Sequence, residues 1–352
     1  MSATKLPQRW PAPASRRPII FVGAGGIVRA AHVPAYRAAR FPMAGAFDVN
    51  ASAARSLAAS LPGCRVYRTL AEAAREREVI FDVAVPAGEI LGVLRALPEG
   101  AAALIQKPMG RDLKEARAIV DVCKKRKITA AVNFQLRFAP NLLALRAAVD
   151  RGILGSILDV EVRVATFTPW ANWTFLRDIP RLEILYHSIH YLDWVRSLLG
   201  EPRRVTAWVG GDPRARGYAD VRSTSLLDYG DRRALVTTQH FHRGKRHAVS
   251  ELRIEGTAGR AVARLGVNLD YPRGLPDTLE LERDGRHKTT SRSVALRGSW
   301  FPHAFEGTMA SLQRFVAGES RELPTAVGDA LQTMALVERC YRSAQKKADR
   351  FL

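Results

Sequence analysis

The chain has 352 residues, of which 47% are hydrophobic, and this length is enough for two domains that each bury a core. Lys and Arg outnumber Asp and Glu by 54 to 34, a net charge of +20, but the charges are scattered and the one dense basic run is 124–127. Because no basic stretch alternates with aromatic residues, we expect no nucleic-acid partner, while an anionic substrate stays open. No apolar run reaches the ~20 residues of a membrane span, so we expect no membrane partner.

Two further features bear on where the protein resides. Cys64, Cys123 and Cys340 have neither metal-ligand nor disulfide spacing, which favours a reducing compartment. Residues 1–17 are polar and rich in proline, so we expect a mobile tail. The segment 15–17 (SRR) is similar to a twin-arginine export signal, but no small-residue cleavage site follows it. We therefore expect a cytoplasmic protein.

Residues 18 to about 135 alternate strand and helix patterns. Apolar runs that end near Gly or Pro indicate buried strands, and helical spacing of apolar residues follows them. This alternation predicts a parallel sheet covered by helices on both faces. The strands are expected at 19–22, 43–47, 79–85, 101–105 and 128–134, and the helices at 27–40, 52–60, 69–77, 89–97 and 113–125.

The pattern changes after residue 138. Val160, Val162 and Val164 alternate with charged residues, which indicates a half-exposed strand of an antiparallel sheet. We therefore expect a first domain over 18–138 and a second over 139–352, with an open, mainly antiparallel sheet, flanking helices and a final helix that can pack back on the first domain. Its other strands are expected at 203–209, 224–229, 234–241 and 251–255, and its helices at 182–199, 304–316 and 327–344.

Residues 23–28 (GAGGIV) join the first strand to the first helix, which is the context of a dinucleotide site. Gly23 permits the tight turn, and Gly25 lets the backbone approach a pyrophosphate at the helix N-terminus. Val28 replaces the third glycine of the motif, which indicates a slightly wider approach of helix and strand. Asp48 ends the next strand, where a carboxylate accepts ribose hydroxyls and repels a 2′-phosphate, so NAD is favoured over NADP. A purely structural glycine turn is the alternative.

Lys107 follows another strand of the parallel sheet, in the segment 106–108 (QKP). The carboxyl ends of such strands form the cofactor crevice. A lysine there can hydrogen-bond the substrate and the nicotinamide ribose, and its charge stabilises the alkoxide that develops as hydride leaves a carbinol carbon. Because most lysines lie on surfaces, the segment alone is equally consistent with a solvated side chain.

The helix expected at 182–199 carries polar residues beside its apolar stripe. Tyr186 and His190 are one turn apart, and the ordinary pKa of His190 suits a general base for a substrate hydroxyl. Asp193 can orient the imidazole. The alternatives are a solvated helix face and histidines, His187 included, that satisfy buried backbone groups.

Two other patterns have open interpretations. His187 with His190, or His240 with His242, can begin a metal site, but no third ligand is evident and we expect no metal. The segment 168–173 (TPWANW) can line a sugar-sized pocket or form a packed loop.

In this order, the segments resemble the glucose–fructose oxidoreductase/inositol dehydrogenase family, often called Gfo/Idh/MocA, from about residue 18 to 344. No single motif carries the resemblance, but the ordered set does. The set comprises the glycine loop, Asp48, Pro86 at a strand end, Gln106-Lys107-Pro108, the segment 133–140, Tyr186-x-x-x-His190-x-x-Asp193 and a closing pattern over 305–343.

The resemblance implies a Rossmann domain, then an open-sheet domain that forms a homodimer or homotetramer through its sheet. It also implies NAD(P)-dependent oxidation of a secondary hydroxyl of a sugar, cyclitol or sugar acid. The implied cofactor contacts are Gly23, Gly25, Gly26, Ile27, Asp48, Asn50, Pro86, Gln106 and Lys107. The implied catalytic residues are Lys107, His190, Tyr186 and His187, and the expected substrate contacts are Arg137, Trp170, Trp173, Arg181 and His190.

Three further positions depart from the family pattern, one of which is Ile90, where many members have histidine after the strand-end proline. Tyr186 stands where the helix motif has aspartate, so either Tyr186 relays a proton or His187 substitutes. Gln106 replaces glutamate and removes a negative charge beside Lys107. Two alternatives to net dehydrogenation therefore stay open: an enzyme that uses tightly bound NAD transiently for epimerisation, elimination or glycosidic cleavage, and a non-catalytic dinucleotide-binding sensor.

Overall fold

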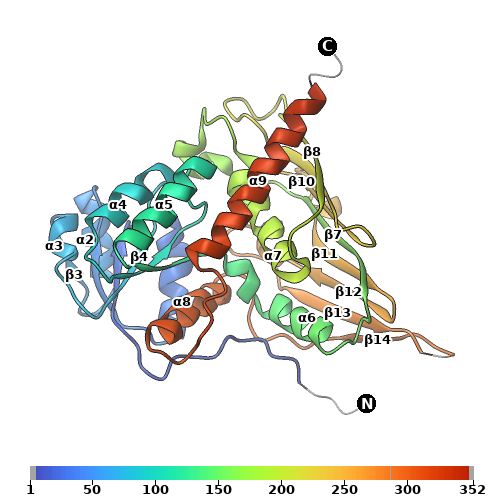
Figure 1. Cartoon of the computed structure of the whole chain (residues 1–352), viewed down its shortest axis with the longest axis horizontal. Helices are drawn as coiled ribbons and strands as arrows, with labels where there is room; N and C mark the ends of the chain where they lie inside the picture. The colour runs from blue at the N-terminus through green and yellow to red at the C-terminus, as the bar shows by residue number, and fades with distance from the viewer. Residues whose placement is uncertain (1–4, 286, 349–352) are drawn as a thin grey trace. The chain divides into compact units, whose positions relative to one another are not determined.

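A computed structural model describes residues 5–285 and 287–348, which form two compact units (Figure 1). The first comprises Trp10–Gln135 and Pro302–Ala335 and is called here the parallel-sheet unit. The second comprises Leu136–Phe301 with the described residues of both chain ends, 5–9 and 336–348, and is called the mixed-sheet unit. Each unit has its own sheet.

The parallel-sheet unit contains a six-stranded sheet in the order β3-β2-β1-β4-β5-β6. All of its strand pairs are parallel. The strands β1, β4 and β5 are buried along their whole length, because both faces of the sheet are covered. This is the Rossmann strand order, whose switch point lies between β1 and β4. The strands are β1 (Ile19–Val22), β2 (Met43–Phe47), β3 (Arg65–Val66), β4 (Ile80–Val83), β5 (Ala102–Ile105) and β6 (Thr129–Val132).

Helices from both ends of the chain cover this sheet. Asp112 caps the N-terminus of α5, since its side chain accepts a hydrogen bond from the backbone N–H of Glu115. Helix α8, far along the sequence, packs on β5, β6 and α1. The helices are α1 (Val33–Ala38), α2 (Ala51–Ala59), α3 (Leu70–Ala73), α4 (Ile90–Ala96), α5 (Leu113–Lys125), α8 (His303–Val316) and the first part of α9 (Val327–Ala348).

The mixed-sheet unit contains an eight-stranded sheet in the order β14-β13-β12-β11-β7-β10-β9-β8. Its described strand pairs are antiparallel except for β7 with β10, so the sheet is mixed and mainly antiparallel. The alternation predicted along β7 is confirmed: Val160, Val162 and Val164 are buried, and Glu161 is exposed. The strands are β7 (Ile157–Ala165), β8 (Arg204–Gly210), β9 (Arg222–Asp228), β10 (Arg233–Gln239), β11 (Val249–Gly256), β12 (Gly259–Arg264), β13 (Thr278–Arg283) and β14 (Thr290–Ser293).

Helices α6 (Pro140–Asp150) and α7 (Ile189–Leu199) lie against this sheet (Figure 1). α6 contacts β12 and β13, and α7 contacts β10. A π-helical turn, η6 (Ile184–Ser188), runs directly into α7, so the helix expected at 182–199 has two parts. The sequence patterns did not identify α6 or the strands β12 to β14.

The units differ from the expected domain division in two respects. Pro302–Ala335 joins the parallel-sheet unit, because α8 packs on β5 and β6 and Ala326 bridges to Ala131 in β6. Within the expected mobile tail, residues 1–4 lie outside the described residues, while the rest has defined partners. Gln8 Nε2 donates to Ala295 O at 2.8 Å, and Arg17 N donates to Gln313 Oε1 at 2.7 Å.

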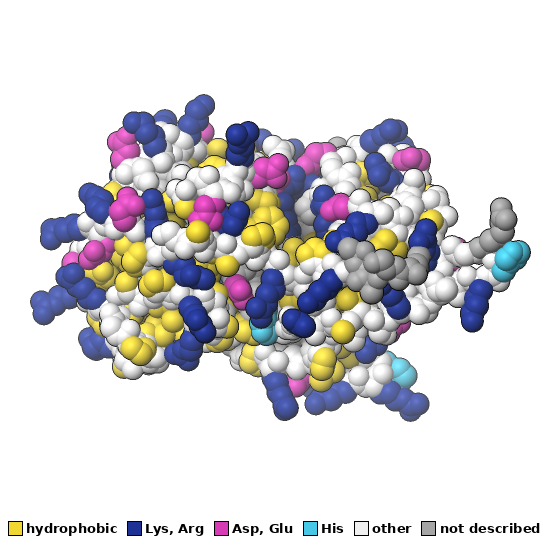
Figure 2. All heavy atoms as spheres, turned by 90° about the horizontal axis from the view of Figure 1, so that it is seen from below, with side chains coloured by type: hydrophobic (Ala, Val, Ile, Leu, Met, Phe, Trp, Pro, Cys, Tyr) yellow, Lys and Arg dark blue, Asp and Glu magenta, His cyan; other side chains and the backbone are white. Residues whose placement is uncertain are grey.

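The basic residues are spread over the surface instead of forming one track. Figure 2 shows Lys and Arg side chains over the visible face with acidic side chains among them. Some of the basic side chains form ion pairs. Arg260, for example, has its Nε 3.3 Å from Glu255 Oε1 and its Nη1 3.1 Å from Glu282 Oε2. None of the helices in the described ranges is both long enough and apolar enough to span a bilayer.

Candidate functional site

The glycine turn after β1 requires glycine at its first position. Gly23 has a φ of +104°, and a Cβ there would lie 2.3 Å from the carbonyl oxygen of Ala84, which follows β4. The turn therefore fits tightly between the ends of the two strands at the topological switch point. The expectation for Gly23 agrees with this geometry.

The next glycines leave open space. A Cβ at Gly25 or Gly26 would meet nothing within 4 Å, and both residues are exposed. The helix that follows begins with a π-helical turn (Val28–His32), in which Val28 is fully buried. The wider π-helical turn accompanies the valine at the third glycine position, while the exposed backbone of the loop stays accessible to a pyrophosphate.

Asp48 is held by the loop that it faces. Its Oδ2 accepts a hydrogen bond from Ala24 N at 2.7 Å, and its Oδ1 accepts one from Asn50 N at 2.8 Å. The side chain is half-exposed, and each carboxylate oxygen keeps acceptor capacity for a ribose hydroxyl. Asn50 uses its own Oδ1 to cap α2, by accepting from Ser52 N and Ala53 N.

Arg29 is a residue near the loop that the sequence analysis missed. Its guanidinium donates from Nη2 to Ala53 O at 2.8 Å and from Nε to Ala24 O at 3.2 Å. A cation therefore lies between the glycine loop and the first turn of α2. A basic residue one turn after the glycines was the available sequence signal, but such residues are too common to single one out.

Lys107 lies immediately beyond β5. Gln106 N donates to Val83 O at 2.9 Å, which continues the β4–β5 ladder up to the lysine. Lys107 is half-buried, and desolvation by burial lowers its pKa to about 8. Pro86, the other expected residue at this edge, is exposed after the end of β4.

A buried polar network in the same unit positions Gln106. Its Oε1 accepts from Asn133 Nδ2 at 3.0 Å, and Thr308 Oγ1 of α8 donates to Asn133 Oδ1 at 2.8 Å. Asn133 Nδ2 also lies 3.3 Å from His32 Nε2, and the other ring nitrogen of His32 is 2.7 Å from Asp82 Oδ2. An amide at position 106 suits this network because a neutral side chain needs no counter-charge there. The sequence analysis did not identify these partners.

The polar residues of η6 and α7 have different surroundings within the mixed-sheet unit. His190 is 5% exposed, and its ring meets that of Trp300 edge-on at 5.5 Å. Tyr186 is half-buried against an apolar cluster that includes Trp170, and its ring is 6.4 Å from that of Phe175.

Three expected site residues take part in ion pairs. Asp193 accepts from Nε and Nη2 of Arg137, both at 2.6 Å, so this carboxylate holds an arginine in addition to any effect on the imidazole. Arg181 donates to Glu338 Oε2 at 2.6 Å and lies over the Tyr341 ring at 4.8 Å. Both arginines expected to contact substrate therefore have their charge balanced by a carboxylate.

A series of neighbouring rings runs from the segment 168–173 to α7 and is called here the aromatic series. Successive centroids are between 5.4 and 6.1 Å apart. The series consists of Trp170, Trp173, Tyr271, Phe301, Trp300 and His190. The structure thus brings Trp170 and Trp173 into one series with His190, through three rings that the sequence analysis missed.

Asp277 holds the aromatic series at Trp300. Its Oδ2 accepts from Trp300 N at 2.5 Å, and its Oδ1 accepts from Gly266 N at 2.6 Å. Desolvation by burial raises the pKa of Asp277 to about 6, although the two backbone hydrogen bonds oppose the rise. Asp277 therefore links the backbone of Trp300 to that of Gly266.

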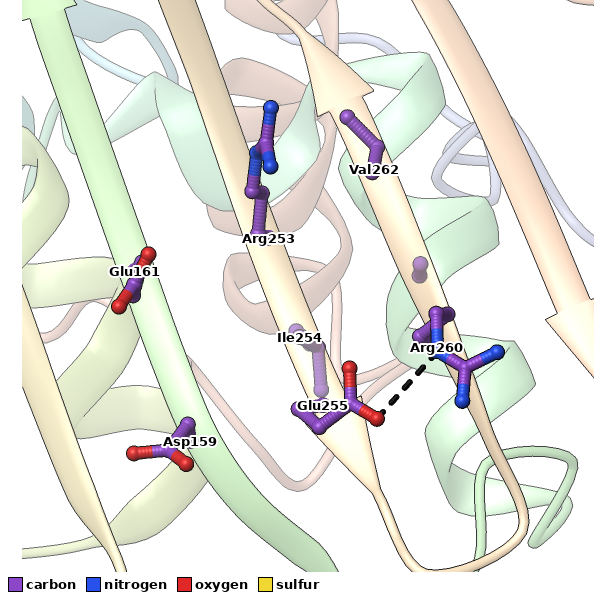
Figure 3. Close-up of a pocket in the computed structure, with 8 residues that line it drawn as sticks. Asp159, Glu161, Arg253, Ile254, Glu255, Arg260 and Val262 are labelled. Carbon is purple, nitrogen blue, oxygen red and sulfur yellow. Dashed lines mark hydrogen bonds and ion pairs between the residues drawn. The ribbon is translucent and has the colours of Figure 1, made fainter.

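A separate hollow lies on the outward face of β7, β11 and β12 (Figure 3). Charged side chains dominate it, and Arg260 pairs with Glu255 there at 3.3 Å. Because its charges neutralise one another, we do not assign this hollow to a substrate. Its lining consists of Asp159, Glu161, Arg253, Ile254, Glu255, Arg260, Ala261 and Val262.

Family models match most of the chain. Residues 18–134 match the model of an oxidoreductase family with an NAD-binding Rossmann fold, and residues 146–350 match the C-terminal alpha/beta domain of the same family. The first match covers the strands of the parallel sheet, and the second covers the mixed sheet. The two models describe the C-terminal and the N-terminal domain of one family, named Gfo/Idh/MocA.

Individual relatives agree with these matches. A D-apiose dehydrogenase of Paraburkholderia graminis is 27% identical over 290 residues, which cover 80% of this chain and 75% of the relative. An inositol 2-dehydrogenase of Rhizobium meliloti is 34% identical over 119 residues, 31% of this chain and 32% of the relative. A crystal structure of an oxidoreductase from Agrobacterium radiobacter, in complex with NAD+, L-tartaric acid and magnesium, superposes with a TM-score of 0.77 at 20% identity, covering 94% of this chain and 97% of that one.

Proposed function

Since the chain belongs to the Gfo/Idh/MocA oxidoreductase family, we propose that it catalyses reversible oxidation of a secondary hydroxyl of a sugar or cyclitol with NAD as the cofactor. The resemblance noted in the sequence is thereby confirmed, and the protein is an oxidoreductase. The observation that carries the proposal is the open loop at Gly25 and Gly26 with Asp48 fixed beside it.

The residues present fit a dinucleotide. The exposed backbone at Gly25 and Gly26 suits a pyrophosphate, and Asp48 offers two carboxylate acceptors to the adenosine ribose. Bound NAD would supply the hydride acceptor. Ile27 and Pro86 flank the ends of β1 and β4 in the same unit and remain proposed cofactor contacts.

NAD is proposed over NADP on electrostatic grounds. A 2′-phosphate next to Asp48 would meet a carboxylate whose position is fixed by two backbone N–H groups. Arg29 would favour NADP, because its positively charged guanidinium lies between the loop and α2 and would attract a 2′-phosphate. Its hydrogen bonds to two carbonyl oxygens direct it to the backbone, so Asp48 decides the preference.

We assign the acid–base step to His190 and electrostatic stabilisation to Lys107. His190 is a nearly buried imidazole at the end of the aromatic series, and it would take the proton from the substrate hydroxyl. Lys107, as an ammonium, would stabilise the negative charge that develops on that oxygen. Tyr186 lies against an apolar cluster, so we propose that it shapes the pocket and does not relay a proton.

An uncharged polyol is the proposed substrate class. The printed names of relatives include dehydrogenases for D-apiose, levoglucosan and inositol. The half-buried members of the aromatic series, Trp173, Tyr271 and Phe301, can pack against the apolar side of a sugar. Arg137 and Arg181 are already balanced by Asp193 and Glu338. A sugar acid would need a cation in addition to these two arginines.

The protein is also proposed to form a homodimer or homotetramer through the outward face of its mixed sheet. That face presents the exposed Glu161 on β7 beside Arg253 on β11, an arrangement that a twofold-related copy can complement. Light scattering on the wild type and on the Glu161→Arg variant would test the proposed oligomer. The substitution should lower the measured mass. A wild type that already has the mass of a monomer would exclude the oligomer.

The test of the activity is NADH formation over a panel of aldoses, cyclitols and sugar acids, with NAD affinity measured separately by calorimetry. NADH that accumulates with a neutral polyol supports the proposal. NAD binding without NADH, but with consumption of the polyol, would favour transient use of the cofactor, for which the tyrosine at position 186 is the motivating departure. NAD binding with no change in any polyol would favour a sensor.

A further inference from the structure

Glu183, His187 and His240 form a buried cluster in the mixed-sheet unit. One ligand atom from each lies within 4.8 Å of those of the other two, and no second such group was found among the described residues. Glu183 Oε1 is 3.2 Å from His240 Nε2 and 3.7 Å from His187 Nδ1. The two imidazole rings meet edge-on, with centroids 4.1 Å apart.

The fold assembles this cluster from two elements. Glu183 precedes η6 and His187 lies four residues later, so both project from the same side of the turn. His240 directly follows β10, where its backbone N–H donates to Val221 O at 3.1 Å. The sequence analysis paired His187 with His190 and found no third ligand; the structure instead joins one histidine of each pair through Glu183.

The carboxylate of Glu183 needs a cation. Its side chain is fully buried, and Oε2 has no hydrogen-bond partner in the described part of the chain. Its Oε1 accepts a hydrogen bond from Ser188 Oγ at 2.7 Å, so Oε2 is the carboxylate oxygen that is left for a further ligand. A buried charge of this kind is stable only when it is paired. In the described ranges its ion-pair partners are the two histidines and no lysine or arginine.

Thr168 fixes the outer nitrogen of His240. Its Oγ1 lies 2.7 Å from His240 Nδ1, on the side of the ring away from Glu183. In the tautomer in which His240 donates Nδ1–H to this hydroxyl, the lone pair of Nε2 is directed towards Glu183 and is available to a cation bound between the two side chains. Metal-binding histidines characteristically donate their other N–H in this way.

We infer that Glu183, His187 and His240 bind a divalent transition-metal ion of the Zn²⁺ type. Two imidazole nitrogens and one carboxylate oxygen are a donor set that suits Zn²⁺ and leaves a fourth position for water. Mg²⁺ and Ca²⁺ are disfavoured, because both prefer oxygen ligands throughout. Trp170, whose ring is 5.1 Å from that of His240, supplies the apolar surroundings that strengthen such a site.

The site is distinct from the residues assigned to hydride transfer. His190 and Lys107 are not among its ligands, so the inference does not depend on the proposed activity. A bound ion would tie η6 to the end of β10 and, through Thr168, to the segment after β7. The expected consequence is metal-dependent thermal stability of the full-length protein.

The experiment measures Zn²⁺ binding by the full-length, chelator-treated protein in competition with a chromophoric indicator. His240→Ala should abolish stoichiometric binding. Thr168→Val, which keeps the volume but removes the hydroxyl, should weaken binding by ~10–100-fold, and Thr168→Ser should restore it. The matched control is His242→Ala. His242 lies two residues further along the same segment, but its Nε2 is hydrogen-bonded to Gly244 O at 2.8 Å and is not part of the cluster. This control should bind Zn²⁺ like the wild type.

A second readout avoids any variant that fails to fold. Co²⁺ added to the wild type should give the visible d–d absorption of a four- or five-coordinate ion, and Zn²⁺ should displace it. Failure of the wild type to bind stoichiometric Zn²⁺, or Co²⁺ without that absorption, would overturn the inference. Equal Zn²⁺ affinity of the wild type and a folded His240→Ala variant would also overturn it, because the ion would then lie elsewhere.

Discussion

Replacement of Asp48 by asparagine is the sharpest test of the cofactor assignment. A carboxylate has about four lone-pair positions, and the loop uses one on each oxygen through Ala24 N and Asn50 N. One acceptor on each oxygen is then left for the two ribose hydroxyls. Asp48→Asn removes the charge and replaces one acceptor oxygen with a donor nitrogen.

The magnitude follows from that count. A hydrogen bond to a charged group contributes roughly 1.5–3 kcal/mol, so loss of one should weaken NAD binding by about 10- to 150-fold. NADP should lose less or gain affinity, because the repulsion of its 2′-phosphate disappears with the charge. The ratio of the two dissociation constants is therefore more informative than either constant alone.

Calorimetric titration of both dinucleotides into both proteins is the assay. Asp112→Asn is the matched control: it makes the same carboxylate-to-amide change in the same unit, at a helix cap. It should alter stability without changing the NAD-to-NADP ratio. An Asp48→Asn protein that binds NAD as tightly as the wild type, with an unchanged ratio, would refute the assignment of Asp48 to the ribose.

Three further predictions concern His190, Lys107 and Asp277. His190→Ala should lower kcat by ~10²–10⁴ with unchanged NAD affinity, as stopped-flow and calorimetry would show, and full activity would exclude the acid–base role. Because the pKa of Lys107 is lowered to about 8, kcat/KM for polyol oxidation should fall as the pH rises above that value and the ammonium is lost; Lys107→Arg should remove this alkaline limb, and persistence of the limb would assign it to another group. Asp277 has its pKa raised to about 6 when folded against an ordinary value of 3.8, so the folded state holds the proton more tightly and the free energy of unfolding should fall by about 2 kcal/mol as the pH rises from 4 to 6. Urea unfolding at both pH values should show this loss in the wild type and a flatter profile in Asp277→Asn; identical profiles would contradict it.

The glycine turn and the position of Asp48 at the end of the next strand were predictable because their sequence signals are local. The glycine turn and Asp48 lie within one strand–helix–strand unit of about 30 residues, where each position has a stated physical role. The strand order of a parallel sheet then brings their ends together without further information. Likewise, the alternation along β7 predicted which side chains face the core, because successive residues of a strand point to opposite faces.

The partners of the polar side chains were not predictable in the same way. Arg137 and Asp193 are 56 residues apart, and Arg181 and Glu338 are 157 apart, so no local pattern links them. Sequence reasoning offered both arginines to the substrate, but the structure balances each with a carboxylate. Separation along the sequence also explains why Asn133 was not identified as the partner of Gln106, or Thr308 as the partner of Asn133.

The sequence by itself determined the parallel sheet, the mainly antiparallel character of the second sheet, the glycine turn and its acidic neighbour, since hydrophobic periodicity and turn chemistry act over a few residues. Only the tertiary structure decided which charges neutralise one another, which rings join His190, and that Glu183 meets His187 and His240. These pairings depend on how distant segments are brought together by sheet order and helix packing. A buried charge must find its partner in space, whatever its distance along the chain.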